Sequence, residues 1–170
     1  NMNLAIWDIE SSSASTDFGS IIEIGGVLVD ENFKEKDRFN LRCRLPEGEI
    51  FQAMALIVNK TSIKKLTQAN LSHYQMLAEV EKIFKKWSPA IFLGWSNIGF
   101  DDEMIRKEFF KGIRYPYLTN AAPNKRHDGI NIARAAYAVD PNILEVEFNE
   151  KNNAVFKLES LARMQGIDSS

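Results

Sequence analysis

The sequence predicts a mixed α/β fold, with a three-strand antiparallel meander followed by helices and a parallel strand. Three early segments have strand patterns, an apolar run, a run rich in β-branched residues and a run that alternates polar and apolar residues, and short links join them. Later segments space their apolar residues at helical intervals around one short, continuous apolar run, as expected for a buried parallel strand. Because no internal repeat or linker interrupts the chain, we expect one domain over residues 1–170.

The first strand is expected over residues 4–10, an apolar run that ends in the carboxylates Asp8 and Glu10. Side chains two residues apart on a strand share a face. Carboxylates about 4 Å apart repel by about 4 kcal/mol at an effective dielectric constant of about 20. A divalent metal ion would remove this repulsion. The alternative is a strand end with two ordinary surface acids, since Asp-x-Glu alone is a weak signal.

Two further strands complete the predicted meander. Residues 21–29 are rich in β-branched side chains and contain two adjacent glycines, which indicates a bulge or a close backbone approach. After a turn at residues 30–32, residues 38–43 alternate polar and apolar side chains. The short links favour antiparallel pairing of all three strands.

The middle of the chain predicts a helix and then a buried strand. Ser72 and Gln75 have the spacing of a helix capping box. One apolar helix face follows, formed by Leu77, Val80, Phe84 and Trp87. Residues 90–95 are continuously apolar and of strand length, which predicts a central parallel strand.

Three more helices are expected, one after residue 101, one over residues 130–139 and one after residue 156. The polar and acidic residues 142–153 predict a mobile loop between the last two. Gly166 suits the end of the last helix. His73, beside the capping serine, is expected at the surface, and His127, just before a helix, is expected to be structural.

Topology gives Asp101 a possible place in the same site as Asp8 and Glu10. In open sheets, sites lie at the carboxyl ends of strands where the strand order switches. Asp8 and Glu10 end the first strand, and Asp101 follows the fourth by a few residues. Carboxylate ligands without a nearby histidine or cysteine favour Mg²⁺ or Mn²⁺ over zinc. The alternative is that Asp101 only caps a helix.

Composition limits the class of protein. Apolar residues make up 45% and charged residues 26% of the chain, as in ordinary globular domains. The net charge of −2 provides no overall basic field for nucleic acid. The single cysteine, Cys43, excludes an intrachain disulfide and suits the cytoplasm. No apolar run is long enough to span a membrane, so no membrane association is expected.

Two motifs in this order, Asp8-x-Glu10 and Asn97-x-x-Phe100-Asp101, resemble the DEDD superfamily of 3′→5′ exonucleases, which have a ribonuclease H-like fold. The resemblance is greatest to the catalytic domain of the bacterial exodeoxyribonuclease I family. Residues 99–103 are its most specific part. The similarity also runs through residues 93–98, 115–117, 135–138 and 156–161.

The resemblance implies a site with two divalent metal ions, Mg²⁺ or Mn²⁺. Asp8, Glu10 and Asp101 would be three of the four acidic ligands, with Asp8 bridging both ions. The family also has a histidine base and a fourth aspartate in an H-x4-D motif after the helix that matches residues 158–165. That motif has no counterpart in these 170 residues, so we expect the chain to be truncated before it.

The implied reaction is hydrolysis of phosphodiester bonds at the 3′ end of single-stranded DNA, with release of 5′-mononucleotides. Ser11, Asn59, Lys60 and Phe100 match positions that would bind the substrate, although the family usually has Thr-Gly at 59–60. Stacking aromatics and cations would hold the strand. The candidates for stacking are Trp95, Phe100 and Tyr115, and those for phosphate are Lys60, Lys64, Lys65, Lys125 and Arg126.

Two other functions stay open. The first is an oligoribonuclease-like activity on RNA, because nothing in the sequence reads a 2′-hydroxyl unambiguously. The second is a non-catalytic nucleic-acid-binding domain that has kept the fold. The three acids favour an enzyme over such a domain. The sequence identifies no protein partner.

Overall fold

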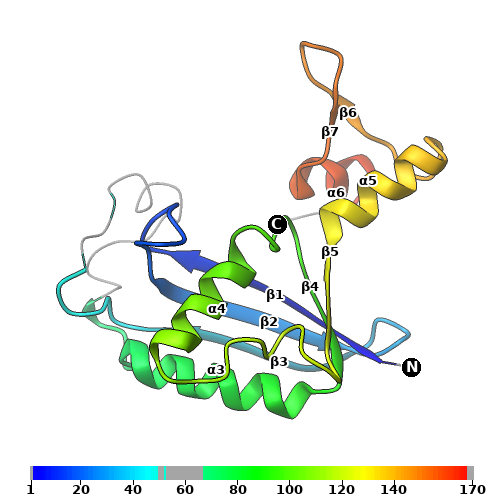
Figure 1. The fold of residues 1–170 in the computed structure, drawn as a ribbon. Coiled ribbons are helices and arrows are strands. Elements are labelled where there is room, and N and C mark those ends of the chain that lie inside the picture. Colours follow the sequence, from blue (N-terminus) through cyan, green and yellow to red (C-terminus); the bar gives the residue numbers. More distant parts are fainter. Residues whose placement is uncertain (1, 50–51, 53–66, 168–170) are drawn as a thin grey trace. The chain divides into compact units, whose positions relative to one another are not determined.

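Residues 2–49, 52 and 67–167 of the chain are described by a computed structural model (Figure 1). The chain forms two compact units, Asn1–His127 and Asp128–Ser170. None of the described helices has the length and apolar character needed to cross a membrane. The candidate residues Asn59, Lys60, Lys64 and Lys65 lie outside the described residues.

The first unit is built on a five-stranded sheet in the order β3-β2-β1-β4-β5. The predicted meander is confirmed, because β1 pairs antiparallel with β2, and β2 with β3. The predicted parallel neighbour is also confirmed, since β4 pairs with β1 in parallel. The strands are β1 (Asn3–Ser11), β2 (Ile21–Val29), β3 (Glu35–Arg42), β4 (Ala90–Gly94) and β5 (Lys125–Asp128).

The side chains of β1 point alternately to the core face of the sheet and to the opposite face. Ala5, Trp7 and Ile9 are buried, whereas Asp8 between the last two is exposed. The period of two that places side chains on opposite faces thus directs the apolar set inward. The carboxylates at the end of the strand consequently point away from the core.

Helix α3 (His73–Trp87) covers the core face of the sheet. The predicted capping box is present, because Ser72 accepts from the Gln75 backbone and the Gln75 side chain accepts from the Ser72 backbone. Phe84 lies at the centre of an aromatic cluster, with its ring 4.9 Å from that of Phe92 and 5.6 Å from that of Trp7. Burial of these rings stabilises α3 against β1 and β4.

Helix α4 (Asp101–Lys111) follows β4 and packs on the same face as α3 (Figure 1). The predicted apolar side is confirmed, since Met104, Ile105 and Phe109 are buried in the core cluster that includes Trp7 and Ile9. Because both helices contribute to this cluster, neither covers the face of β1 that carries Asp8 and Glu10.

The second unit contains α5 (Gly129–Val139), α6 (Leu158–Met164) and a hairpin of β6 (Glu147–Phe148) and β7 (Ala154–Val155). The prediction of a mobile loop over residues 142–153 is therefore wrong at residues 147–148, which form a strand of this hairpin. The Asn149 carboxamide closes the hairpin turn by accepting from the backbones of Lys151 and Asn153, both at 3.0 Å. Gly166 has φ of 74° after α6, the left-handed conformation that glycine adopts most easily.

Candidate active site

Asp8 and Glu10 lie on the same face of β1, as the alternation predicted, and both line a shallow depression of about 200 Å³. Asp8 is exposed and Glu10 is half-buried. The other lining residues come from β1, β2 and β3 and are Ile9, Glu23, Gly25 and Asn40. The depression is therefore a feature of the sheet surface itself, with two carboxylates along one side.

Strand register adds a third carboxylate that sequence reasoning missed. Glu10 on β1 is directly opposite Glu23 on β2, and Glu23 is opposite Arg42 on β3. The Arg42 Nε donates to Glu23 Oε2 at 2.9 Å, so the guanidinium neutralises part of this charge. Glu23 lies in an apolar strand segment, and only the pairing register shows that it faces Glu10.

Asp8, Glu23 and Arg42 surround Glu10 with two negative charges and one positive charge, an excess of negative charge. Partial burial raises the pKa of the Glu10 carboxyl, and the negative charges of Asp8 and Glu23 raise it further. Arg42 opposes the shift but does not cancel it. A carboxyl whose pKa is raised by neighbouring negative charges is suited to binding a cation together with those neighbours, because the cation removes the repulsion.

A bulge lies directly after Glu10. The β1–β2 register shifts between Glu10, which pairs with Glu23, and Ser11, which pairs with Ile21. Such bulges bend a strand and redirect its side chains, and they often occur beside functional sites. Ser11 is buried, and its hydroxyl donates to the Ser13 carbonyl at 2.7 Å. Its predicted contact with a substrate remains a prediction.

Asp101 is buried in the first turn of α4. The alternative in which it caps the helix is wrong, because the N-cap residue is Phe100, which makes no side-chain cap. Asp101, Asp102 and Glu103 place three acidic side chains in the first turn, where they interact favourably with the positive end of the helix dipole.

The neighbouring Asp102 joins α4 to the elements around it. Its carboxylate accepts from Asn97 Nδ2 at 2.6 Å and from Thr119 Oγ1 at 2.9 Å, and Arg126 NH1 lies 3.8 Å away. Gly94 makes room for this arrangement, since a Cβ there would lie 2.6 Å from the Asn97 Cβ. Burial raises the pKa of Asp102, and the hydrogen bonds and Arg126 offset this only in part.

The structure thus brings Asp8 and Glu10 together but does not place Asp101 among the residues that line their depression. Within residues 2–49, 52 and 67–167, no group of three His, Cys, Asp or Glu side chains is arranged to hold a metal ion. The convergence of Asp8, Glu10 and Asp101 on one ion remains a prediction.

The other candidate residues for substrate binding differ in exposure. Phe100 is half-buried against the core cluster, Trp95 is half-buried, and Tyr115 and Lys125 are exposed.

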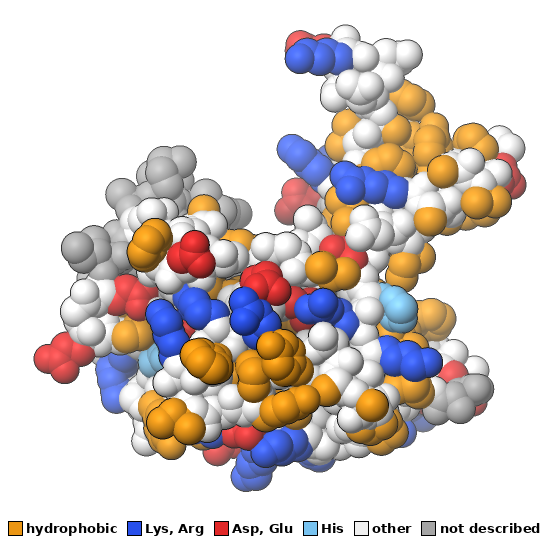
Figure 2. Space-filling model, in the orientation of Figure 1, with side chains coloured by type: hydrophobic (Ala, Val, Ile, Leu, Met, Phe, Trp, Pro, Cys, Tyr) orange, Lys and Arg blue, Asp and Glu red, His pale blue; other side chains and the backbone are white. Residues whose placement is uncertain are grey.

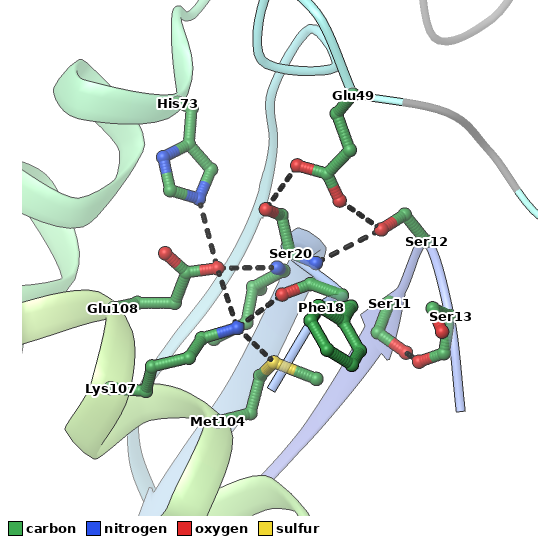
Figure 3. A network of polar contacts seen from close by, with 12 residues as sticks. Ser11, Ser12, Ser13, Phe18, Ser20, Glu49, His73, Met104, Lys107 and Glu108 are labelled. Carbon is green, nitrogen blue, oxygen red and sulfur yellow. Dashed lines mark hydrogen bonds and ion pairs between the residues drawn. The ribbon is translucent and has the colours of Figure 1, made fainter. Parts of the chain in front are cut away.

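A buried polar network holds the chain that follows Glu10 (Figure 3). Glu108 Oε1 accepts from the Ile21 backbone N–H at 3.2 Å and lies 3.5 Å from His73 Nε2 and 3.8 Å from Lys107 Nζ. Lys107 also donates to the Gly19 carbonyl. These contacts tie the start of β2 to α3 and α4. The surface position predicted for His73 is wrong, because its Nε2 is buried.

The two ends of the β1–β2 connection are also joined to each other. Ser12 and Ser20 both donate their hydroxyls to Glu49, and the Ser20 backbone N–H donates to the Ser12 hydroxyl at 2.9 Å. The Ser12 backbone N–H donates to the Ser20 carbonyl, also at 2.9 Å. Together with the Glu108 contacts, this fixes the backbone immediately after Glu10.

We expect Glu108 to make the stability of the fold depend on acid pH. Burial raises the pKa of Glu108, but His73, Lys107 and the Ile21 N–H together outweigh it, so the net pKa is lowered. The stabilisation by the Glu108 carboxylate is complete above the unfolded glutamate pKa of about 4.3 and is lost as the pH falls through the lower folded value. Glu108→Gln should therefore unfold at a lower temperature at neutral pH and lose less stability on acidification.

Thermal unfolding of wild type and Glu108→Gln across this pH range measures the effect. Glu79→Gln is the matched control, because Glu79 is an exposed carboxylate on the neighbouring helix α3. Parallel pH curves for wild type and Glu108→Gln would contradict the expectation.

Comparison with known proteins identifies relatives by sequence. No protein-family profile matches the chain. Exodeoxyribonuclease I of Buchnera aphidicola (subsp. Schizaphis graminum) is 23% identical over 168 residues, which are 98% of this chain and 35% of the relative. The Escherichia coli exodeoxyribonuclease I is 26% identical over 129 residues, which are 75% of this chain and 27% of that protein. The chain spans about a third of the length of these curated relatives.

Solved structures show the same relationship in three dimensions. E. coli exonuclease I in complex with a dT13 oligonucleotide superposes with a TM-score of 0.92 at 21% identity, covering 100% of this chain and 37% of the other. A product-bound structure of exonuclease I gives the same TM-score and covers 40% of that chain. The mixed sheet and its helices therefore have the predicted ribonuclease H-like fold. In sequence and in fold, this chain is similar to exodeoxyribonuclease I of the DEDD exonucleases, as its motifs indicated.

Proposed function

We propose that the protein is a metal-dependent 3′→5′ exonuclease that hydrolyses single-stranded DNA and releases 5′-mononucleotides. The observation that carries this proposal is the pair Asp8 and Glu10, held on one face of β1 and facing Glu23, in a fold shared with exonuclease I. The solved relatives bound to oligonucleotides support single-stranded DNA as the substrate.

The residues present fit divalent metal ions. The donors are all carboxylate oxygens, which Mg²⁺ and Mn²⁺ prefer. The negative charges that raise the pKa of Glu10 are those that a cation would neutralise. Asp8 and Glu10 would hold the metal, with Asp101 as the third ligand. Bound there, such ions would supply Lewis-acid activation of the attacking water and charge stabilisation of the departing 3′ oxygen.

The protein's own side chains have separate tasks in this proposal. Arg42 holds Glu23 by a hydrogen bond, which keeps the Glu23 carboxylate fixed opposite Glu10. The bulge at Ser11 and the Ser12–Glu49–Ser20 contacts fix the backbone that would face the terminal nucleotide. The Asp102 contacts hold the first turn of α4, and with it Asp101, at the end of β4.

The test is degradation of single-stranded DNA labelled at its 3′ or 5′ end, in magnesium and in excess chelator. The assay uses the full-length protein, since the chain matches only about a third of its relatives. We expect the 3′ label to be released first as a mononucleotide, and the 5′-labelled strand to shorten stepwise. Chelator should stop the reaction, because the carboxylates alone supply no Lewis acid.

Three outcomes would count against the proposal in different ways. Release of the 5′ label first would reverse the polarity. Faster degradation of the matching RNA strand would favour the oligoribonuclease-like alternative. Binding of DNA without magnesium-dependent cleavage would favour a non-catalytic nucleic-acid-binding protein.

We also propose that the protein is located in the cytoplasm, a location supported by the resemblance and compatible with the single buried cysteine.

A further inference from the structure

The segment 101–126 has a small excess of positive charge although the whole chain does not. It carries six lysines and arginines and four acidic residues, a balance of +2 in a chain of net charge −2. Arg106, Lys107 and Arg114 are paired with Glu103, Glu108 and Glu81, which leaves Lys111, Lys125 and Arg126 as the cations most available to a partner. Figure 2 shows lysine and arginine side chains over α4, with acidic side chains among them and hydrophobic side chains beside them. These available cations give phosphate groups a place to bind, and the neighbouring aromatic side chains decide what kind of partner carries them.

Three aromatic side chains of this segment are exposed. Phe110 is 71% exposed, Tyr115 52% and Tyr117 46%, whereas the adjacent Phe109 is fully buried in the core. The rings of Tyr115 and Tyr117 are 6.0 Å apart and form an edge-to-face pair. These three rings are not needed to fill the core, and they present flat apolar surface to solvent.

A pocket of about 280 Å³ lies beside Tyr117. Arg106 and Arg126 both line it, together with the acidic side chains of Asp102 and Glu103 and the polar side chains of Thr119 and Asn120. The Arg106 guanidinium is held by Glu103 through hydrogen bonds of 2.7 and 3.0 Å. The Arg126 guanidinium is 3.8 Å from Asp102, beyond hydrogen-bond length, so it retains donors for a ligand.

We propose that this α4 surface, formed by Arg106, Phe110, Tyr115, Tyr117 and Arg126, binds a stretch of single-stranded nucleic acid away from the Asp8–Glu10 depression. A phosphate would bind at Arg126 in the pocket, and bases would stack on Tyr117 and Phe110. The proposal deepens the proposed function, on which it rests for the identity of the strand. The two sites share no lining residue: the depression is lined by β1, β2 and β3, and the pocket by α4, the segment after it and β5.

Aromatic rings interleaved with cations favour a nucleic acid over a protein partner. Every base has a flat face that can stack on a ring, and the phosphate between bases needs a cation nearby. Arginine presents a planar set of donors that matches phosphate geometry. Lys111 and Lys125, both exposed, extend the positive charge beyond the pocket. A second contact of this kind would hold a long strand while its end is being processed.

The proposal is tested by binding of a 5′-fluorescent thymidine oligonucleotide, followed by anisotropy in excess chelator so that cleavage plays no part. Tyr117→Ala and Phe110→Ala should each weaken binding about fivefold or more, since each removes one stacked base. Arg126→Gln should also weaken binding and flatten its dependence on salt. The full-length protein is used for every variant.

Phe33→Ala and Lys34→Gln are the matched controls. Phe33 is 74% exposed, like Phe110, but lies in the turn between β2 and β3, and Lys34 is the exposed cation next to it. Both variants should bind as the wild type does. If Tyr117→Ala and Phe110→Ala bind no more weakly than Phe33→Ala, the α4 surface is not a nucleic-acid site.

This failure is distinct from failure of the proposed function. A protein that degrades DNA normally but whose Tyr117 and Phe110 variants bind like the controls would overturn only the α4 surface. A protein whose binding depends on Tyr117 and Phe110, but which never releases a nucleotide, would support the surface and overturn the nuclease. Melting curves of each variant show whether a loss of binding reflects loss of fold.

Discussion

Replacing Asp8 with asparagine or Glu10 with glutamine is expected to reduce nucleotide release by about a thousandfold or more, since metal-ion catalysis contributes several kcal/mol. Both changes keep the shape of the side chain and remove the charge that would hold the metal. Because Asp8 is exposed and Glu10 is half-buried among other acids, neither change should harm folding. Loss of a charge that is repelled by its neighbours removes a cost to the folded state.

The measurement is the rate of 3′ nucleotide release, combined with the melting temperature of each variant. Glu31→Gln is the matched control, an exposed glutamate in the turn between β2 and β3, and its rate should equal that of the wild type. Glu23→Gln should fall between these extremes, because Glu23 already has a partner in Arg42. Near-normal activity of both Asp8→Asn and Glu10→Gln would exclude this depression as the catalytic centre.

Asp102→Ala is expected to destabilise the protein by about 2–5 kcal/mol, because it leaves two buried hydrogen-bond donors unpaired. These are the Asn97 carboxamide and the Thr119 hydroxyl, which donate to Asp102 at 2.6 and 2.9 Å. The melting temperature should fall by about 5–15 °C in a chain of this size. Activity should fall as well, since the first turn of α4 carries Asp101.

Asp101→Asn provides the contrast within the same motif. It should abolish nucleotide release and lower stability less than Asp102→Ala does, since asparagine keeps the shape of the side chain and one acceptor oxygen. The lost charge at the helix start accounts for about 0.3–1 kcal/mol. Asp102→Asn, which keeps one acceptor oxygen, should fall between wild type and Asp102→Ala in thermal unfolding. A stable but inactive Asp102→Ala together with an active Asp101→Asn would show that the functional aspartate of the motif is assigned one residue wrong.

Local patterns were enough to predict most of the first unit. The period of two along β1 places Asp8 and Glu10 on one face opposite Trp7, whatever the rest of the chain does. Likewise, Ser72 and Gln75 satisfy each other across the first turn of α3, so this helix start is specified by four consecutive residues. Such features depend on neighbours in sequence, which is why the sequence alone predicts them.

Features that depend on register or on distant partners could not be predicted. Glu23 faces Glu10 only because of how β2 pairs with β1, and a shift of one residue would turn it to the other face. Glu108 is an ordinary helix acid in sequence, yet it binds the start of β2 and His73 from α3. Strand β5, Lys125–Asp128, has no apolar pattern at all, so no periodicity could reveal it.

The two adjacent glycines of β2 meet different requirements. A Cβ on Gly26 would lie 2.9 Å from the Phe39 ring, so core packing excludes a side chain there. A Cβ on Gly25 would meet nothing closer than 3.6 Å, and Gly25 pairs with Asp8. Position 25 therefore offers an attachment point for a reporter group beside the carboxylates. Within these 170 residues a cysteine placed there could be labelled selectively, because Cys43 is buried and burial raises its pKa to about 12.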